Sequence, residues 1–231
     1  MAPINTILIA ILGGILPALF WLWFWLREDN KHPEPKRLIA LSFVFGMCAV
    51  PIAIPFEKLI SIFTYSPLIV LIGWAFVEEA LKYVAAYSGG MHTQAEDEPI
   101  DAMVYLITAA IGFAAAENVL FLLSPLSNGE IFTTLLTGNI RFIGTTLLHV
   151  LSSASVGVFV AFSFYKKKKI RIEHLVLGLV LATALHTVFN FFIINTGQQW
   201  MFTVFAFLWV AIVVLLLIFE RVKRITRTAN N

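Results

Sequence analysis

Long apolar runs follow one another along almost the whole chain, and they limit what it can fold into. Of its 231 residues, 59% are hydrophobic and 13% are charged, whereas soluble domains average about 25% charged residues. A membrane-spanning helix needs about 20 mostly apolar residues, and only helices or closed barrels satisfy their backbone hydrogen bonds in lipid. The runs are too long and too uniformly apolar for barrel strands. We therefore predict an all-α, polytopic transmembrane helical bundle that forms a single domain over residues 1–231.

We predict about seven spans, within a range of six to eight. The spans cover residues 4–26, 38–55, 66–87, 100–123, 141–165, 174–194 and 200–219. Residues 56–65 form either a short interfacial helix or an extension of a neighbouring span. Proline and glycine among polar residues predict loops at "KHPEPKR", "GGMHTQAEDEP" and "LSPLSNGE".

Lys and Arg concentrate in three segments, residues 27–37, 166–171 and 221–227. Such residues stay on the cytoplasmic side of short loops, and seven spans put all three segments on one side. The pattern predicts an N-terminus outside the cell membrane and a C-terminus inside. We interpret the run of four lysines as a topology anchor on the lipid bilayer, and expect no nucleic-acid partner. The other basic residues are Lys58, Lys82 and Arg141.

Several predicted spans carry polar or ionisable side chains. Such residues are costly in lipid, usually face the bundle interior and often mark a functional site. The third span holds Glu78, Glu79 and Lys82, the fourth Glu117 and Asn118, the fifth His149 and Ser153, and the sixth His186 and Asn190. Residues four apart on a helix share one face, so the members of the His149–Ser153 and His186–Asn190 pairs point the same way.

Adjacent residues on a helix point about 100° apart, so Glu78 and Glu79 cannot face one spot equally. We expect one glutamate at a site and the other tied to Lys82. In the predicted topology Glu117, His149 and His186 lie about 9–14 Å from the outer ends of their spans, and Glu78 about 18 Å, at 1.5 Å rise per residue. These depths predict one polar site that opens toward the outer half of the membrane.

This set of side chains suits amide hydrolysis. A glutamate in an apolar pocket serves as a general base for water, and an asparagine or a neutral histidine donates to a developing oxyanion. Alternatively, Glu117, His149 and His186 form a two-histidine, one-carboxylate zinc set, with Glu78 as the base beside the metal. The sequence has no His-Glu-x-x-His and no Gly-x-Ser-x-Gly motif. The expected cofactor is therefore either none or zinc.

Four short motifs resemble the PrsW family of bacterial intramembrane proteases. They are "EEALK" at 78–82, "FAAAEN" at 113–118, "HVLSS" at 149–153 and "HTVFN" at 186–190, and "DAMVY" at 101–105 also fits. The resemblance covers about residues 74–192, the motif-bearing core. The family is related to the CAAX prenyl-protein endopeptidases and to bacteriocin-immunity membrane proteases. The CAAX enzymes have a histidine where this chain has Glu117, which favours PrsW and leaves the metal ligands open.

The resemblance implies a multi-pass protease of the bacterial cytoplasmic membrane. Its implied substrate is a membrane-embedded protein, in the family a single-pass anti-sigma factor that is first cut on its extracytoplasmic side during a stress response. Carried over by motif, the catalytic residues are Glu78, Glu79, His149, His186 and Asn190, with Glu78 as the base and Asn190 as the oxyanion donor. The supporting residues are Lys82, Glu117, Asn118 and Ser153.

Two other functions fit the buried polar residues. A proton- or cation-coupled transporter also uses buried Glu, Lys and His, although the chain has no inverted repeat or paired broken helices. A non-catalytic membrane scaffold or immunity protein is the third hypothesis.

Overall fold

Seven long helices and one short helix make up the described part of the chain. The computed structural model describes residues 3–27, 32–195 and 198–226, with no side chains described at 198–201. The helices are α1 (Ile4–Leu26), α2 (Lys36–Phe63), α3 (Pro67–Ala86), α4 (Asp101–Ser127), α5 (Ile131–Ile140), α6 (Thr146–Phe162), α7 (Lys168–Asn195) and α8 (Gln198–Val222). Two π-helical segments are η2 (Tyr87–Met91) and η3 (Arg141–Thr145). No described residue lies in a strand, so the all-α prediction is confirmed.

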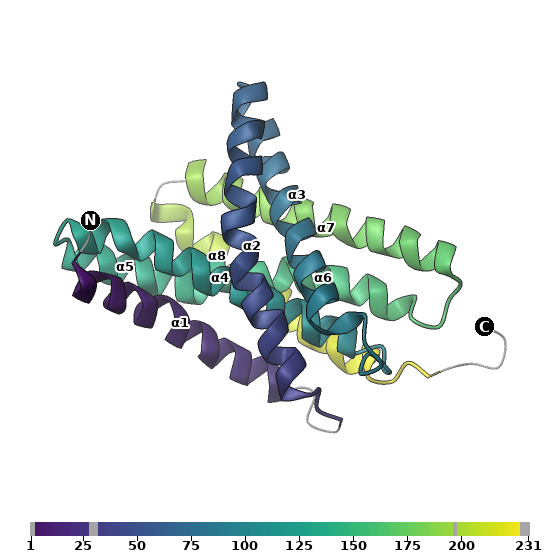
Figure 1. The fold of residues 1–231 in the computed structure, drawn as a ribbon. Coiled ribbons are helices and arrows are strands. Elements are labelled where there is room, and N and C mark those ends of the chain that lie inside the picture. Colours follow the sequence, from purple (N-terminus) through teal and green to yellow (C-terminus); the bar gives the residue numbers. More distant parts are fainter. Residues whose placement is uncertain (1–2, 28–31, 196–197, 227–231) are drawn as a thin grey trace.

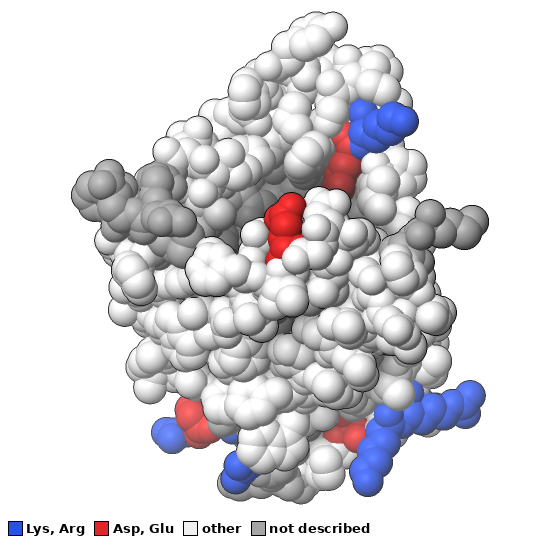
Figure 2. Space-filling model, turned by 90° about the vertical axis from the view of Figure 1, so that its left-hand side faces the viewer, with Lys and Arg blue, Asp and Glu red and all other residues white. Residues whose placement is uncertain are grey.

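Within the described residues, six stretches are long and apolar enough to cross a membrane. Five are the helices α1, α2, α4, α7 and the apolar part of α8, and the sixth is the continuous α5–η3–α6 segment. Helix α3 is the seventh long helix and is not among these six because it carries three charged residues, Glu78, Glu79 and Lys82. On the face drawn in Figure 2, the visible Lys and Arg side chains gather mainly at the lower end, and most of the surface above them is uncharged. This is the surface of a polytopic membrane protein.

Residues 56–63 extend α2, which is the second of the two alternatives predicted for this segment. Other predicted boundaries were wrong: the fourth long helix continues through Pro125 to Ser127, and the segment predicted to begin at 141 begins at Ile131. Proline and glycine are frequent in turns, but they do not always end a helix. A proline in the last turn of a helix removes few backbone hydrogen bonds. The predicted loop "GGM" likewise belongs to η2, which continues α3.

Helix α4 lies at the centre of the bundle (Figure 1). Every residue from Asp101 to Ala115 is buried, because α1, α2 and α6 pack around this helix. A helix that is apolar on all sides is expected in the interior of a bundle or in a membrane. Helix α7 packs against α6 and α3. The α2–α3 hairpin crosses the other helices steeply, and its turn projects beyond them (Figure 1).

Two glycines let α2 and α4 touch through their backbones. A Cβ atom added at Gly46 would lie 2.0 Å from the carbonyl oxygen of Ala109, and one added at Gly112 would lie 2.0 Å from that of Phe43. Small residues at helix crossings permit this close approach in membrane proteins. The contact fixes the rotation of α4, and with it the direction of the "FAAAEN" side chains that follow Gly112.

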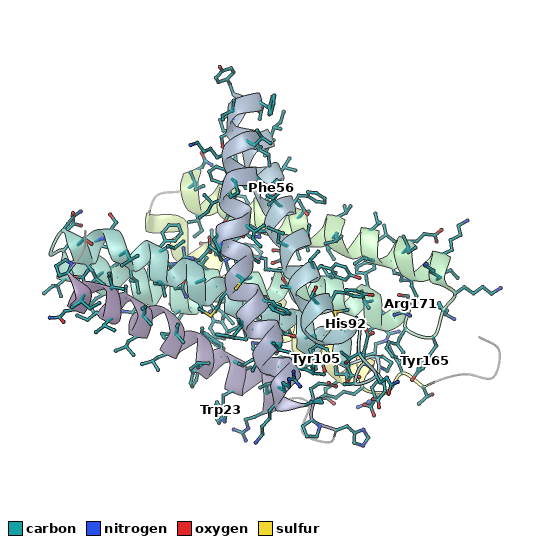
Figure 3. The ribbon with its side chains drawn as sticks, in the orientation of Figure 1. Trp23, Phe56, His92, Tyr105, Tyr165 and Arg171 are labelled. Atoms are coloured by element: carbon teal, nitrogen blue, oxygen red, sulfur yellow. The ribbon has the colours of Figure 1, made fainter. Side chains whose placement is uncertain are left out.

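The start of α2 and the α3–α4 and α6–α7 connections lie at the same end of the molecule as the C-terminal end of α8 (Figure 1). Figure 3 shows His92, Tyr165 and Arg171 at that end, whereas Phe56 lies toward the other end of α2. The three basic segments therefore share one end, although residues 28–31 and 227 of those segments lie outside the described residues. The orientation with the N-terminus outside stays a prediction.

Candidate active site

Helices α3, α4, α6 and α7 bring a set of buried polar side chains together. Glu78 is 7% exposed and Lys82 is 0% exposed. Glu79, His149 and His186 are each 1% exposed. They come from the separate spans that the sequence analysis singled out, so the predicted convergence is found in the structure.

Glu79 is an anchored carboxylate. Its Oε1 accepts hydrogen bonds from Lys82 Nζ at 2.6 Å, from Ser152 Oγ at 2.8 Å and from His186 Nδ1 at 2.8 Å. Its Oε2 accepts one from Ser153 Oγ at 2.8 Å. A buried carboxylate with this many donors is held in one geometry. Glu79 therefore positions its neighbours, and it is the glutamate tied to Lys82, as the helix spacing allowed.

Glu78 is in the opposite situation. Its Oε2 atom is buried and accepts no hydrogen bond from the described residues. The atom lies 3.7 Å from His186 Nε2, 3.8 Å from His149 Nδ1 and 3.9 Å from Lys82 Nζ. Buried polar atoms without a partner are rare in folded proteins and require an explanation. This oxygen is available to a proton, a water molecule or a metal ion.

Each histidine is oriented by a carboxylate. His186 donates from Nδ1 to Glu79, which leaves the Nε2 lone pair facing Glu78. His149 donates from Nε2 to Glu117 Oε2 at 2.9 Å, and its Nδ1 accepts from Lys82 Nζ at 2.9 Å. The two rings are 5.1 Å apart and meet edge to face at 84°. Carboxylates in this position fix the tautomer of a catalytic or ligating histidine.

Arg141 is a site residue that the sequence analysis missed. Its Nη2 donates to Glu117 Oε2 at 2.8 Å and its Nε to Asn118 Oδ1 at 2.6 Å. The guanidinium carbon lies 4.0 Å from the ring centre of Phe121. Arg141 begins the π-helical segment η3, and such segments are frequent at functional sites. The only signal in the sequence was an isolated arginine at the edge of an apolar run.

The remaining predicted residues take supporting positions or lie nearby. Asn118 donates to Thr146 Oγ1 at 3.2 Å besides accepting from Arg141. Ser153 holds Glu79, and its neighbour Ser152, which the sequence analysis quoted but did not select, does the same. Asn190 is half-buried one turn after His186 and forms no hydrogen bond with the described residues. Its role as an oxyanion donor stays a prediction.

Glu78, His149 and His186 form a group that could hold a metal ion, because one ligand atom from each lies within 4.8 Å of the others. Ligands about 2.1 Å from a tetrahedral zinc ion are about 3.4 Å apart, close to the 3.7 and 3.8 Å separations at Glu78. The donor set is that of a three-ligand catalytic zinc site. The set predicted from sequence had Glu117 in place of Glu78, whereas in the structure Glu117 lies on the other nitrogen of His149.

A family model described as PrsW family intramembrane metalloprotease matches residues 34–218. The chain belongs to the PrsW family. It is 27% identical over 195 residues to Protease PrsW of Clostridioides difficile (strain 630), which covers 81% of this chain and 79% of that protein. It is 28% identical over 196 residues to Protease PrsW of Geobacillus kaustophilus (strain HTA426), with 82% and 81% covered. The match to Protease PrsW of Bacillus subtilis (strain 168) is 24% identical over 202 residues, with 86% and 88% covered.

The protein is thus an intramembrane protease and a multi-pass membrane protein of the bacterial type. The family assignment decides against the transporter and the non-catalytic scaffold. All residues of the buried cluster fall within the range that matches the PrsW family. No solved structure matches the chain.

Proposed function

We propose that this PrsW protease hydrolyses a peptide bond of a membrane protein at the face formed by Glu78, His149 and His186. The observation that carries the proposal is the Glu78 Oε2 atom, which is buried, lacks a hydrogen-bond partner among the described residues and lies between two imidazole nitrogens. The surrounding helices orient both imidazole rings through Glu79 and Glu117. A carboxylate oxygen of this kind can act as the general base that accepts a proton from a reacting water.

The same three residues would hold a divalent metal ion of the zinc type. Two imidazoles and a carboxylate are the donors that catalytic zinc takes, and the family description names a metalloprotease. When bound, such an ion supplies Lewis acidity, which polarises a carbonyl group and acidifies water. Glu79 orients His186 for this role, and Glu117 orients His149.

Two further residues have proposed roles. Arg141 fixes Glu117 and so the ring of His149. Asn190 shares a face of α7 with His186, and its amide would donate to the oxygen of the scissile carbonyl as charge develops there.

A metal-free mechanism is the second candidate. It is favoured by the hydrogen bond from Lys82 to His149 Nδ1, which already brings a positive charge to the site. In that mechanism Glu78 Oε2 takes the proton of the attacking water directly, as the sequence analysis proposed. The two mechanisms place Glu78 at the same point and differ in whether zinc is required.

The proposed substrate is a membrane-embedded protein, such as a single-pass anti-sigma factor that is cut toward the outer side. The family resemblance supports this class. The positions of Glu117 and His186 also support it, because they lie nearer the Ser127 and Asn195 ends of their helices, which would be the outer ends if the N-terminus is outside.

Zinc content and cleavage, measured on the same purified preparations, test the proposal. Glu78→Gln is compared with the wild type and with Glu130→Gln, a control on an exposed glutamate. We expect wild type and Glu130→Gln to bind about one zinc and to cleave a single-span substrate, and Glu78→Gln to lose both. Full cleavage by Glu78→Gln would disprove the site. A wild-type enzyme that stays active without metal and in chelator would leave only the metal-free mechanism.

A further inference from the structure

Lys82 is a fully buried cation at the centre of the site. Its side chain is 0% exposed, which is rare for lysine unless it is paired. Its Nζ atom lies 2.6 Å from Glu79 Oε1, 2.9 Å from His149 Nδ1 and 3.9 Å from Glu78 Oε2. It also lies 4.9 Å from the ring centre of Phe113. The ammonium thus contacts one member of the candidate metal set directly and lies near a second.

The contact with His149 conflicts with metal binding. The Nε2 atom of this histidine is engaged by Glu117, so Nδ1 is the nitrogen that faces Glu78. A neutral imidazole has one lone pair, and at His149 Nδ1 that lone pair accepts from Lys82. The same lone pair cannot accept a hydrogen bond and bind a metal ion. Metal can therefore bind His149 only after Lys82 has left this nitrogen.

We propose that Lys82 is an internal competitor of the metal ion. Its ammonium keeps the metal-free site ordered by bridging Glu79 and His149, and it gives up His149 when the ion binds. The hydrogen bond to Glu79 gives the ammonium a partner that it can keep. This inference rests on the metal-dependent form of the proposed function.

The charges around the site make the competition strong. Three carboxylates, Glu78, Glu79 and Glu117, face Lys82 or its neighbours, and Glu57 is close enough for its charge to act on Glu78. A single positive charge a few Å from a buried ion changes that ion's affinity strongly. Without the charge of Lys82, the carboxylates attract a divalent ion more strongly.

If Lys82 only supports the site, its removal should weaken zinc binding instead of strengthening it. If the lysine only oriented His149 and Glu79, its removal would disturb the ligands. Loss of such outer partners typically weakens metal binding by about 10–100-fold. The direction of the change in affinity therefore separates the two roles.

Zinc affinity in detergent, measured by competition with a chelator of known affinity, tests the inference. The variants are Lys82→Met, which removes the charge and keeps an unbranched side chain one atom shorter, and Lys82→Gln, which removes the charge and keeps an N–H donor on a side chain one atom shorter. Lys58→Met is the control, because Lys58 is exposed on α2. We expect both Lys82 variants to bind zinc about tenfold or more tightly than wild type, and Lys58→Met to match wild type.

Unchanged or weaker zinc binding in both Lys82 variants would overturn the competition and leave the proposed metal site standing. If neither wild type nor any variant binds zinc, the metal-dependent proposal and this inference both fail. Thermal unfolding provides a second measurement. Lys82→Gln should unfold at a lower temperature than wild type without zinc, and should gain more from saturating zinc than wild type gains. An equal gain in the two proteins would contradict the competition.

Discussion

Substitution by glutamine should destabilise the protein at Glu79 but hardly at Glu78. Glu79→Gln replaces a carboxylate that accepts four hydrogen bonds, one of them from the ammonium of Lys82. The amide nitrogen of glutamine donates and cannot accept, so at least one donor loses its partner. Removing one partner of a buried ion pair costs about 3–5 kcal/mol. We expect the free energy of unfolding to fall by about that amount.

Glu78→Gln should leave the free energy of unfolding within about 1 kcal/mol of the wild-type value. Its Oε2 atom accepts no hydrogen bond from the described residues, and its nearest cation, Lys82, is 3.9 Å away. The substitution leaves no donor unpaired, and it removes a buried charge whose desolvation opposes folding. Proteolysis should nevertheless be lost, because Glu78 faces both imidazoles.

Reversible unfolding in mixed micelles, followed by circular dichroism, measures the difference between the two variants. Glu130→Gln gives the effect of the same substitution on an exposed residue. The metal-free proteins should be compared, because a bound ligand stabilises the folded state by mass action. If Glu78→Gln loses as much stability as Glu79→Gln, the division between an anchored and an available carboxylate is wrong.

Three further predictions concern the surroundings of the site. Arg141→Gln should lower cleavage by about 10–100-fold through misplacement of His149, and a wild-type rate would refute this role. Gly46→Ala should destabilise the protein by about 1–3 kcal/mol in the same unfolding assay, because its methyl group meets the backbone of α4. Burial raises the pKa of Glu96, in the α3–α4 connection, from 4.5 to about 7. The folded state then binds more protons than the unfolded state between these values, so the contribution of Glu96 to stability is present at low pH and is lost as pH rises through 7. The measurement is the protection of residues 92–100 from hydrogen exchange in wild type, divided by that in Glu96→Gln at the same pH. This ratio should be higher at pH 5 than at pH 8.

The fold was largely predictable because lipid imposes one solution on each long apolar run. The seven predicted spans match seven long helices, since every backbone group in a membrane must find its partner within the helix. Helix ends were less predictable. The extension of α2 to Phe63 and the start of α5 at Ile131 depend on contacts that hydropathy does not contain.

The candidate site was predictable as a set of residues but only partly as an arrangement. Ionisable residues in four spans pointed to one buried cluster, which the structure contains. Arg141 was missed because its partners Glu117 and Asn118 lie on another helix. The π-helical turn at η3 also changes the rotation of the residues that follow it. A constant 3.6-residue period therefore could not relate Arg141 to His149.

The choice between Glu78 and Glu79 shows what sequence spacing leaves undecided. Lys82 is four residues after one and three after the other, so it can pair with either. The other helices decide, because α6 and α7 point three more donors at the carboxylate that turns toward them, and that carboxylate is Glu79. Once Glu79 accepts these bonds, the rotation of α3 leaves Glu78 beside the two imidazoles without a donor of its own. Donors on other helices thus decide which glutamate stays available for chemistry. That glutamate can be identified because its carboxylate oxygen has no hydrogen-bond donor among the described residues.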